Sequence, residues 1–206
     1  MDYMHKKDDS IMTDLFEGQL MSCVTCLSCG YKSATFDNFM DLSIEIPRKA
    51  IKYLGSISLQ DCLKTFFSKE TMRDCGYKCA KCKKEVNIEK EMSIYRLPRL
   101  LTIHLKRFYH SAMRREKISS TVNFPDQGLN MKQFASQSNH SSVNNSSYRL
   151  YGISHHSGSL YGGHYISEVC NVNTNKWYNC NDSHVSQISR PDNSSTSAYV
   201  LFYVMQ

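Results

Sequence analysis

Two pairs of cysteines, each separated by two residues, constrain the fold of this chain more than any other feature. Cys26-Leu27-Ser28-Cys29-Gly30 contains one pair and Cys79-Ala80-Lys81-Cys82 contains the other. A C-x-x-C turn directs two thiolates at one tetrahedral zinc ion, and four thiolates leave no open coordination position. The pairs therefore predict a structural zinc site, formed by Cys26, Cys29, Cys79 and Cys82, that joins distant segments and contributes to folding.

Two further cysteines leave the choice of ligands open. Cys23 stands in C-x-x-C spacing to Cys26, and Cys75 competes with Cys79. We favour Cys26 and Cys29 because only this pair is followed by a glycine, Gly30, which can adopt a positive φ and direct its amide at a sulfur. Ordinary buried thiols without a metal are the alternative interpretation.

Composition indicates an intracellular protein, cytoplasmic or nuclear. The 206 residues contain no apolar run near the ~18 of a membrane span, and the charged N-terminus lacks the apolar region of a secretory signal. In a reducing compartment, the nine cysteines are metal ligands, catalytic thiols or core residues rather than disulfides. The net charge is +6, and its basic clusters are Lys81-Lys83-Lys84, Lys106-Arg107 and Arg114-Arg115-Lys117. These clusters most simply form solvated surface. A binding site for an anionic partner is the alternative.

Hydrophobic periodicity predicts an α+β protein dominated by antiparallel sheet. Ser58 is a candidate N-cap and Asp61 can complete a capping box, which predicts a helix over 59–67. Alternation of apolar residues over 101–105 predicts a half-buried strand. Further strands are predicted near 148–153, 165–169, 177–180 and 198–204. Residues 1–14 are expected to form a disordered lead-in, and the Ser/Asn-rich stretch 133–147 a surface loop insertion.

A second candidate site lies near the C-terminus. His164 opens one predicted strand and Asn181-Asp182 closes the next, so an antiparallel hairpin brings them together. A histidine can take a proton from a thiol, and an amide or carboxylate oxygen that accepts its Nδ1 proton fixes the tautomer. Asn181 is the candidate for that oxygen, with Asp182 as the alternative. A loop histidine without a catalytic role is the simpler interpretation, and His155-His156 raises the weaker alternative of a second metal site.

Four segments of the chain resemble the ubiquitin-specific protease family. The stretch from Tyr148 to Tyr165 resembles the family's histidine box, and Trp177 to Val185 resembles the box that supplies the third catalytic residue. Leu97 to Phe108 resembles the strand that leads into the palm. Leu15 to Leu20, followed by the first cysteine pair, resembles the start of the fingers. The resemblance covers about Leu15 to Val204.

The resemblance implies a papain-like cysteine protease fold, made of fingers, palm and thumb, that holds ubiquitin. It implies His164 as general base, Asn181 as its orienter and Asp182 as a supporting group. It also implies a zinc ion at the four cysteines and a narrow channel under loop 157–163 that admits the Gly-Gly tail of ubiquitin. On this basis residues 15–96 are mainly fingers, residues 97–206 are palm, and the thumb is missing. The expected partners are ubiquitin and ubiquitinated proteins. The chain is expected to be a monomer that binds neither membrane nor nucleic acid.

The family's nucleophile box, a cysteine at the start of a helix, has no counterpart in this sequence. A reactive thiolate needs a helix N-terminus or an adjacent His⁺. Cys62 falls in the middle of a predicted helix, Cys170 ends a strand, and Cys180 points away from Asn181. We therefore expect a fragment of a deubiquitinase that is inactive alone. The rival hypotheses are a non-enzymatic ubiquitin-binding pseudoenzyme and a zinc-ribbon nucleic-acid binder, the latter disfavoured because the C-terminal aromatic residues suit a core.

Overall fold

The computed structural model describes residues 10–47, 55–110, 115–136, 146–159 and 161–206 of the chain. Some predicted features lie partly outside these residues, namely positions 1–9 of the lead-in, 48–54 of the expected fingers, 137–145 of the insertion, 160 of loop 157–163, and Arg114 of the third basic cluster. No helix in the described part of the chain is long and apolar enough to cross a membrane.

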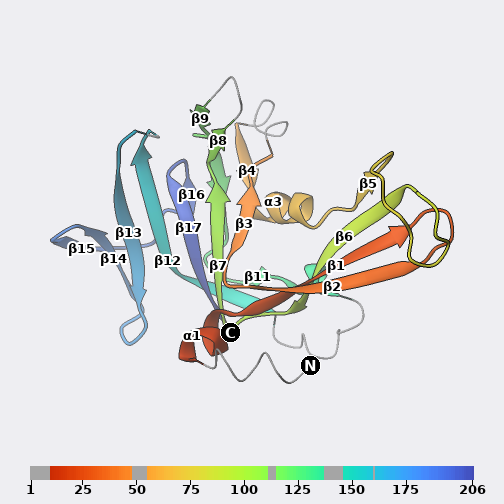
Figure 1. The fold of residues 1–206 in the computed structure, drawn as a ribbon. Helices are drawn as coiled ribbons and strands as arrows, with labels where there is room; N and C mark the ends of the chain where they lie inside the picture. Colours follow the sequence, from red (N-terminus) through yellow and green to blue (C-terminus); the bar gives the residue numbers. More distant parts are fainter. Residues whose placement is uncertain (1–9, 48–54, 111–114, 137–145, 160) are drawn as a thin grey trace.

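The centre of the molecule is an eight-stranded sheet, which we call the palm sheet (Figure 1). Its strands follow the order β15-β14-β13-β12-β17-β7-β3, and β11 pairs with β12 beside this path. The strands are β3 (Leu42–Glu45), β7 (Leu100–Lys106), β11 (Leu129–Asn130), β12 (Ser147–Gly158), β13 (Gly163–Asn171), β14 (Lys176–Asn181), β15 (His184–Ile188) and β17 (Ala198–Met205). The pattern of alternating burial in β7 is the one that the sequence predicts.

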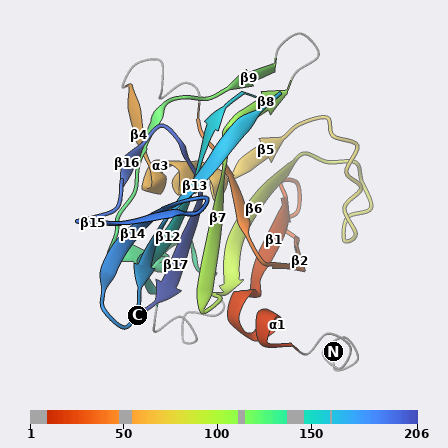
Figure 2. The same ribbon diagram turned by 90° about the vertical axis from the view of Figure 1, so that its left-hand side faces the viewer.

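A separate four-stranded sheet forms the fingers, which extend from one side of the palm sheet (Figures 1 and 2). Its order is β2-β1-β6-β5, and β1 is antiparallel to both of its neighbours. Figure 2 is turned by 90° about the vertical axis, so that the side of the molecule with β13, β14 and β15 faces the viewer. The finger strands are β1 (Gly18–Cys26), β2 (Lys32–Phe39), β5 (Glu70–Met72) and β6 (Ile88–Arg96).

The smaller elements complete the core between the two sheets. Helix α3 (Leu59–Phe66) is capped by Ser58, whose Oγ accepts the Asp61 N–H at 3.1 Å. Its apolar face buries Leu59, Cys62 and Leu63, which confirms the predicted helix. The remaining strands are β4 (Ser56–Ser58), β8 (Phe108–His110), β9 (Arg115–Lys117), β10 (Thr121–Asn123) and β16 (Ser194–Ser195).

Two local predictions need correction. Helix α1 (Ile11–Phe16), with a capping box between Ser10 and Thr13, occupies part of the expected disordered lead-in. A 3-10 helix (Lys132–Phe134) opens the expected loop insertion, because buried Phe134 stacks on Phe67 at a centroid distance of 4.9 Å. The prediction of a fold dominated by antiparallel sheet holds, and the pairs β3–β7 and β4–β10 are parallel exceptions within it.

Arg107 is the largest departure from the expected surface. The sequence places it in a basic cluster with Lys106, but the residue is 0 % exposed. Its guanidinium donates to the carbonyl oxygens of Ala198, Ile118, Ser120 and Ser195. Arg107 is therefore part of the core rather than a site for an anionic partner.

Candidate functional site

The four predicted ligand cysteines lie together at the tip of the fingers. The sulfur atoms of Cys26, Cys29, Cys79 and Cys82 all lie within 4.8 Å of one another. The Cys29 and Cys79 sulfurs are 3.7 Å apart, and a tetrahedral zinc site with Zn–S bonds of ~2.3 Å requires about 3.8 Å between its sulfurs. The donor set and its spacing therefore fit a structural Zn²⁺ ion. Cys23 and Cys75 lie outside this cluster.

The two cysteine turns have the same backbone hydrogen bonds. Gly30 N–H donates to the Cys26 carbonyl, and Lys83 N–H donates to the Cys79 carbonyl, each at 2.9 Å. Both residues have a positive φ, +69° for Gly30 and +61° for Lys83. The positive φ of Gly30 is confirmed, but its amide bonds a carbonyl rather than a sulfur. A glycine after the second cysteine is thus not required, because Lys83 adopts the same conformation. Nothing in the sequence marks this lysine as a residue with a positive φ.

Amide groups that do point at sulfur lower the pKa of one thiol. The backbone N–H groups of Cys82 and Lys81 hold the pKa of Cys79 down to about 6. A thiolate is the form that binds a metal. Cys79 therefore offers a ligand in the correct protonation state near neutral pH.

Replacing Lys83 with glycine should stabilise the metal-bound chain. A left-handed conformation costs an L-residue ~1–2 kcal/mol, while glycine adds about 0.5–1 kcal/mol of unfolded-state entropy. The net gain is up to about 1 kcal/mol, or roughly 2–4 °C in melting temperature. The control is Lys84→Gly, since Lys84 is exposed and has no positive φ. An equal shift in melting temperature in the two variants would show that the positive φ of Lys83 does not destabilise the chain.

The second candidate site brings His164 and Asn181 into contact. The Nε2 atom of His164 lies 2.6 Å from Oδ1 of Asn181. The two residues lie on β13 and β14, and both point to the same face, because Ser167 pairs with Cys180 and side chains alternate along a strand. Asp182 Oδ2 is 3.9 Å from the same Nε2, beyond hydrogen-bond distance, and its side chain is 80 % exposed.

The ring nitrogen that meets Asn181 is the opposite of the expected one. An amide oxygen only accepts, so Nε2 of His164 carries the proton and donates it, whereas the sequence argument assigned this bond to Nδ1. In the neutral ring Nδ1 then holds a lone pair. This arrangement allows Nδ1 to take a proton from a thiol while Asn181 fixes the tautomer.

Glycine is required where β13 begins. A Cβ at Gly163 would lie 2.2 Å from Nε2 of His156 and 2.5 Å from the Ser157 carbonyl oxygen. The close approach lets β12 and β13 pair as far as Gly158 and Gly163. The β12–β13 pairing therefore includes His164, which pairs with Ser157.

A cluster of aromatic side chains, missed by the sequence argument, lies beside this loop. The His156 ring is 4.7 Å from that of Tyr165 and 5.3 Å from that of Phe108, and Tyr199 packs against all three. Burial and nearby Lys117 lower the pKa of His156, so its Nδ1 can accept from Lys117 Nζ at 3.1 Å. Tyr165 is 54 % exposed, so its assignment to the core is wrong, whereas Tyr148 and Tyr203 are buried as the sequence predicts.

Phe108 also contributes to a groove of about 410 Å³, which lies next to this aromatic cluster. The groove is lined by Glu45, Ile46, Pro47, Lys106, Phe108, Tyr109 and Ile118.

His155 and His156 do not form a second metal site. Only the four fingertip cysteines form a group of three or more potential metal ligands in the described part of the chain. His155 is buried and its Nδ1 lies 3.0 Å from Ser197 Oγ, whereas His156 belongs to the aromatic cluster.

The cysteines considered as nucleophiles lie in unreactive positions. Cys62 is buried in α3, and burial raises the pKa of its thiol to about 11. Cys170 is buried at the far end of β13, and Cys180 pairs with Val185 on the face opposite Asn181. Among the described residues, no thiol hydrogen-bonds to His164, whose polar neighbours are Asn181 and Asp182.

Comparison with known proteins places these features in one family. The model of the family "Ubiquitin carboxyl-terminal hydrolase" matches residues 2–203. Ubiquitin carboxyl-terminal hydrolase 2 of Gallus gallus is 42% identical over 200 residues, which are 96% of this chain and 54% of that protein. Ubiquitin carboxyl-terminal hydrolase 21 of Homo sapiens is 40% identical over 199 residues, again 96% of this chain but 34% of that protein.

A solved structure shows the same fold. The SAGA Ubp8/Sgf11/Sus1/Sgf73 DUB module bound to ubiquitin aldehyde contains a chain that matches with a TM-score of 0.82 and 32% identity, covering 100% of this chain and 45% of that one. The present chain thus spans about half or less of the length of these relatives. Its β-rich palm and fingers are those of a partial papain-like catalytic domain, and the chain belongs to the ubiquitin-specific protease family of ubiquitin carboxyl-terminal hydrolases.

Proposed function

We propose that this chain is the fingers-and-palm part of a cysteine-type deubiquitinase, which hydrolyses the bond after the C-terminal glycine of ubiquitin. The observation that carries the proposal is the 2.6 Å contact between His164 Nε2 and Asn181 Oδ1. In this role His164 is the general base, Asn181 orients it, and Asp182 is a supporting polar group. The reaction takes place in the cytoplasm or nucleus, where ubiquitinated proteins are the substrates.

The residues of the chain have separate tasks in this mechanism. Nδ1 of His164 accepts the proton of the attacking thiol and later returns it to the leaving amine, while Asn181 holds Nε2–H throughout. The aromatic cluster of Phe108, His156, Tyr165 and Tyr199 lines the channel for the Gly-Gly tail of ubiquitin. A structural Zn²⁺ ion, held by the four fingertip cysteines, stiffens the fingers and has no part in the chemistry.

The thiol nucleophile in this proposal is supplied from outside these residues. Cys62, Cys170 and Cys180 are the cysteines of the palm and its helix, and their burial or direction keeps them away from His164. The monomeric chain therefore binds ubiquitin but does not complete the reaction.

The test measures binding and turnover on the same preparation. We expect the chain to bind monoubiquitin in a calorimetric titration and to bind ubiquitin without its last two glycines more weakly. A ubiquitin–fluorophore conjugate should be cleaved no faster than its background rate. Turnover that iodoacetamide abolishes would contradict the proposal that the thiol nucleophile comes from outside these residues. Absence of ubiquitin binding would contradict the proposed function. His164→Ala is the control, because it should leave binding intact.

A further inference from the structure

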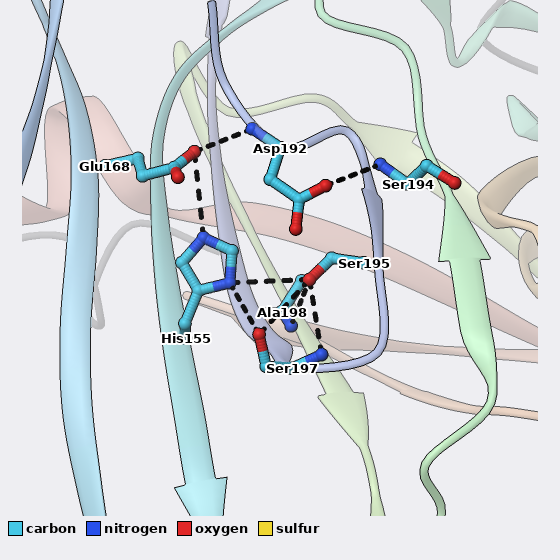
Figure 3. A network of polar contacts seen from close by, with 7 residues as sticks. All are labelled: His155, Glu168, Asp192, Ser194, Ser195, Ser197 and Ala198. Carbon is cyan, nitrogen blue, oxygen red and sulfur yellow. Dashed lines mark hydrogen bonds and ion pairs between the residues drawn. The ribbon is translucent and has the colours of Figure 1, made fainter. Parts of the chain in front are cut away.

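A buried polar network lies on the palm sheet near His164 (Figure 3). His155 on β12 and Glu168 on β13 are 3 % and 8 % exposed. Nδ1 of His155 lies 3.0 Å from Ser197 Oγ, and Glu168 Oε2 accepts the Asp192 N–H at 2.7 Å. His155 Nε2 is 3.7 Å from Glu168 Oε2 and has no hydrogen-bond partner in the described part of the chain. The network thus connects two strands of the sheet to the segment that follows β15.

Glu168 belongs to the face that bears His164 and Asn181. Side chains alternate along β13, so His164 and Glu168 point to the same side. Glu168 pairs with Asn179 on β14, and Asn181 is two residues further along that strand. Pairing between β13 and β14 ends at Ser167 and Cys180. Glu168 and Asn179 are therefore the last paired residues on this face before the strands diverge.

The strands diverge where the His164–Asn181 contact is made. In Figure 1, β14 and β15 form a hairpin that turns away from β13. Asn181 is beyond the last β13–β14 pair but still pairs with His184 of β15. Backbone pairing therefore fixes Asn181 to its own hairpin and not to the strand that carries His164.

Glu168 faces one strand of this hairpin and bonds the segment that follows it. Asn179 of β14 is its partner in the β13–β14 pairing, and its carboxylate accepts the Asp192 amide, four residues after β15. Burial alone would raise the pKa of Glu168, but its contacts with His155, the Asp192 amide and Asn179 outweigh burial and lower the pKa. The side chain is thus a carboxylate at neutral pH, with lone pairs for several donors at once.

We propose that Glu168 is a positioning residue, which fastens the β14–β15 hairpin to β13 so that Asn181 Oδ1 stays on Nε2 of His164. The His155 ring lies between this carboxylate and Ser197, with Nε2 3.7 Å from Glu168 Oε2 and Nδ1 3.0 Å from Ser197 Oγ. The inference deepens the proposed function and rests on it, because the contact that Glu168 maintains is the one that orients the proposed base.

The test reads the ring of His164 directly in the chain. Two-bond ¹H–¹⁵N correlation spectra of ¹⁵N-histidine-labelled protein report which ring nitrogen carries the proton. We expect the wild type to show a dominant Nε2–H tautomer for His164. Glu168→Met keeps the length of the side chain and removes both acceptors, so the two ring nitrogens should shift toward the averaged values of free histidine. Glu168→Gln keeps one acceptor oxygen and should shift them less.

Two further variants separate positioning from general stability. Ile57→Val removes a methyl group from the buried residue on β4, and should lower the melting temperature without moving the His164 resonances. Asn179→Ala removes the side chain that faces Glu168 on β14 and should shift the His164 nitrogens in the same direction as Glu168→Met does, which keeps the test valid if the latter fails to fold. Folded variants with unchanged His164 nitrogens would show that Glu168 is only structural. Absence of ubiquitin binding by the wild-type chain, with the expected His164 tautomer, would instead contradict the proposed function.

Discussion

Removing the metal from the four-cysteine cluster should unfold the tip of the fingers. The buried apolar residues at this end of the molecule are few, and two of them, Cys26 and Cys79, are themselves ligands. The binding free energy of a structural zinc ion, ~10–16 kcal/mol at neutral pH, is then almost entirely free energy of folding. The cluster joins the β1–β2 turn to the segment between β5 and β6, so these turns should lose their protection together.

Metal analysis and hydrogen exchange measure this effect. The purified chain should contain one zinc ion, and chelation should increase amide exchange in β1, β2 and β6 near the cluster while β12 and β17 of the palm keep their protection. Cys79→Ser should reproduce the chelated state. Cys75→Ser is the matched control, because this exposed thiol lies outside the cluster and is only four residues away. Unchanged protection after complete metal removal would contradict a folding role for zinc.

The grouping of the four cysteines is a feature that the sequence predicted well. Ligand spacing is a local property, and the turns around Cys26 and Cys79 have the same geometry whatever the sheet beyond them does. The helix over 59–66 was predictable for a similar reason, since its cap and apolar face lie within a few residues. Such signals depend on neighbours in the sequence.

The parts that the sequence could not predict depend on contacts between distant residues. The hairpin pattern and the resemblance both indicated that His164 meets Asn181, but the ring nitrogen involved depends on the orientation of the side chain, which no sequence pattern encodes. Strand β15, which was missed, has mainly exposed residues and no alternating pattern. The pairing of His155 with Glu168 requires the register of β12 on β13, which no local pattern encodes.

Arg107 is the strongest example of such a distant contact, and its replacement should be the most destabilising single substitution in the palm. Burial lowers the pKa of this guanidinium to about 10, so it remains charged at neutral pH. Its Nε and two Nη atoms bond four carbonyl oxygens at 2.6–3.0 Å, on two segments that follow β9 and β15. No other side chain in the described residues joins both segments to the end of β7 in this way.

Arg107→Met should lower the free energy of unfolding by roughly 5 kcal/mol. It leaves four carbonyl oxygens without this donor, two in buried contacts and two in partly buried ones, at a cost of ~1–3 kcal/mol for each buried oxygen before relaxation. Arg107→Lys keeps the charge, but an ammonium group cannot reach carbonyls on opposite sides, so it should lose at least about 2 kcal/mol. Urea unfolding measures both, and the lysine variant remains informative if the methionine variant does not fold.

Lys106→Met is the control for this prediction. Lys106 precedes Arg107, but its side chain is 47% exposed and lies 3.9 Å from Glu45, an exposed pair worth ~1 kcal/mol or less. Equal losses in Lys106→Met and Arg107→Met would mean that the carbonyl contacts contribute nothing. Because Arg107 also holds Ser195 and Ala198, its loss should loosen the segment that Glu168 bonds through Asp192. Arg107→Lys should therefore shift the His164 ring nitrogens in the same direction as Glu168→Met, by a smaller amount.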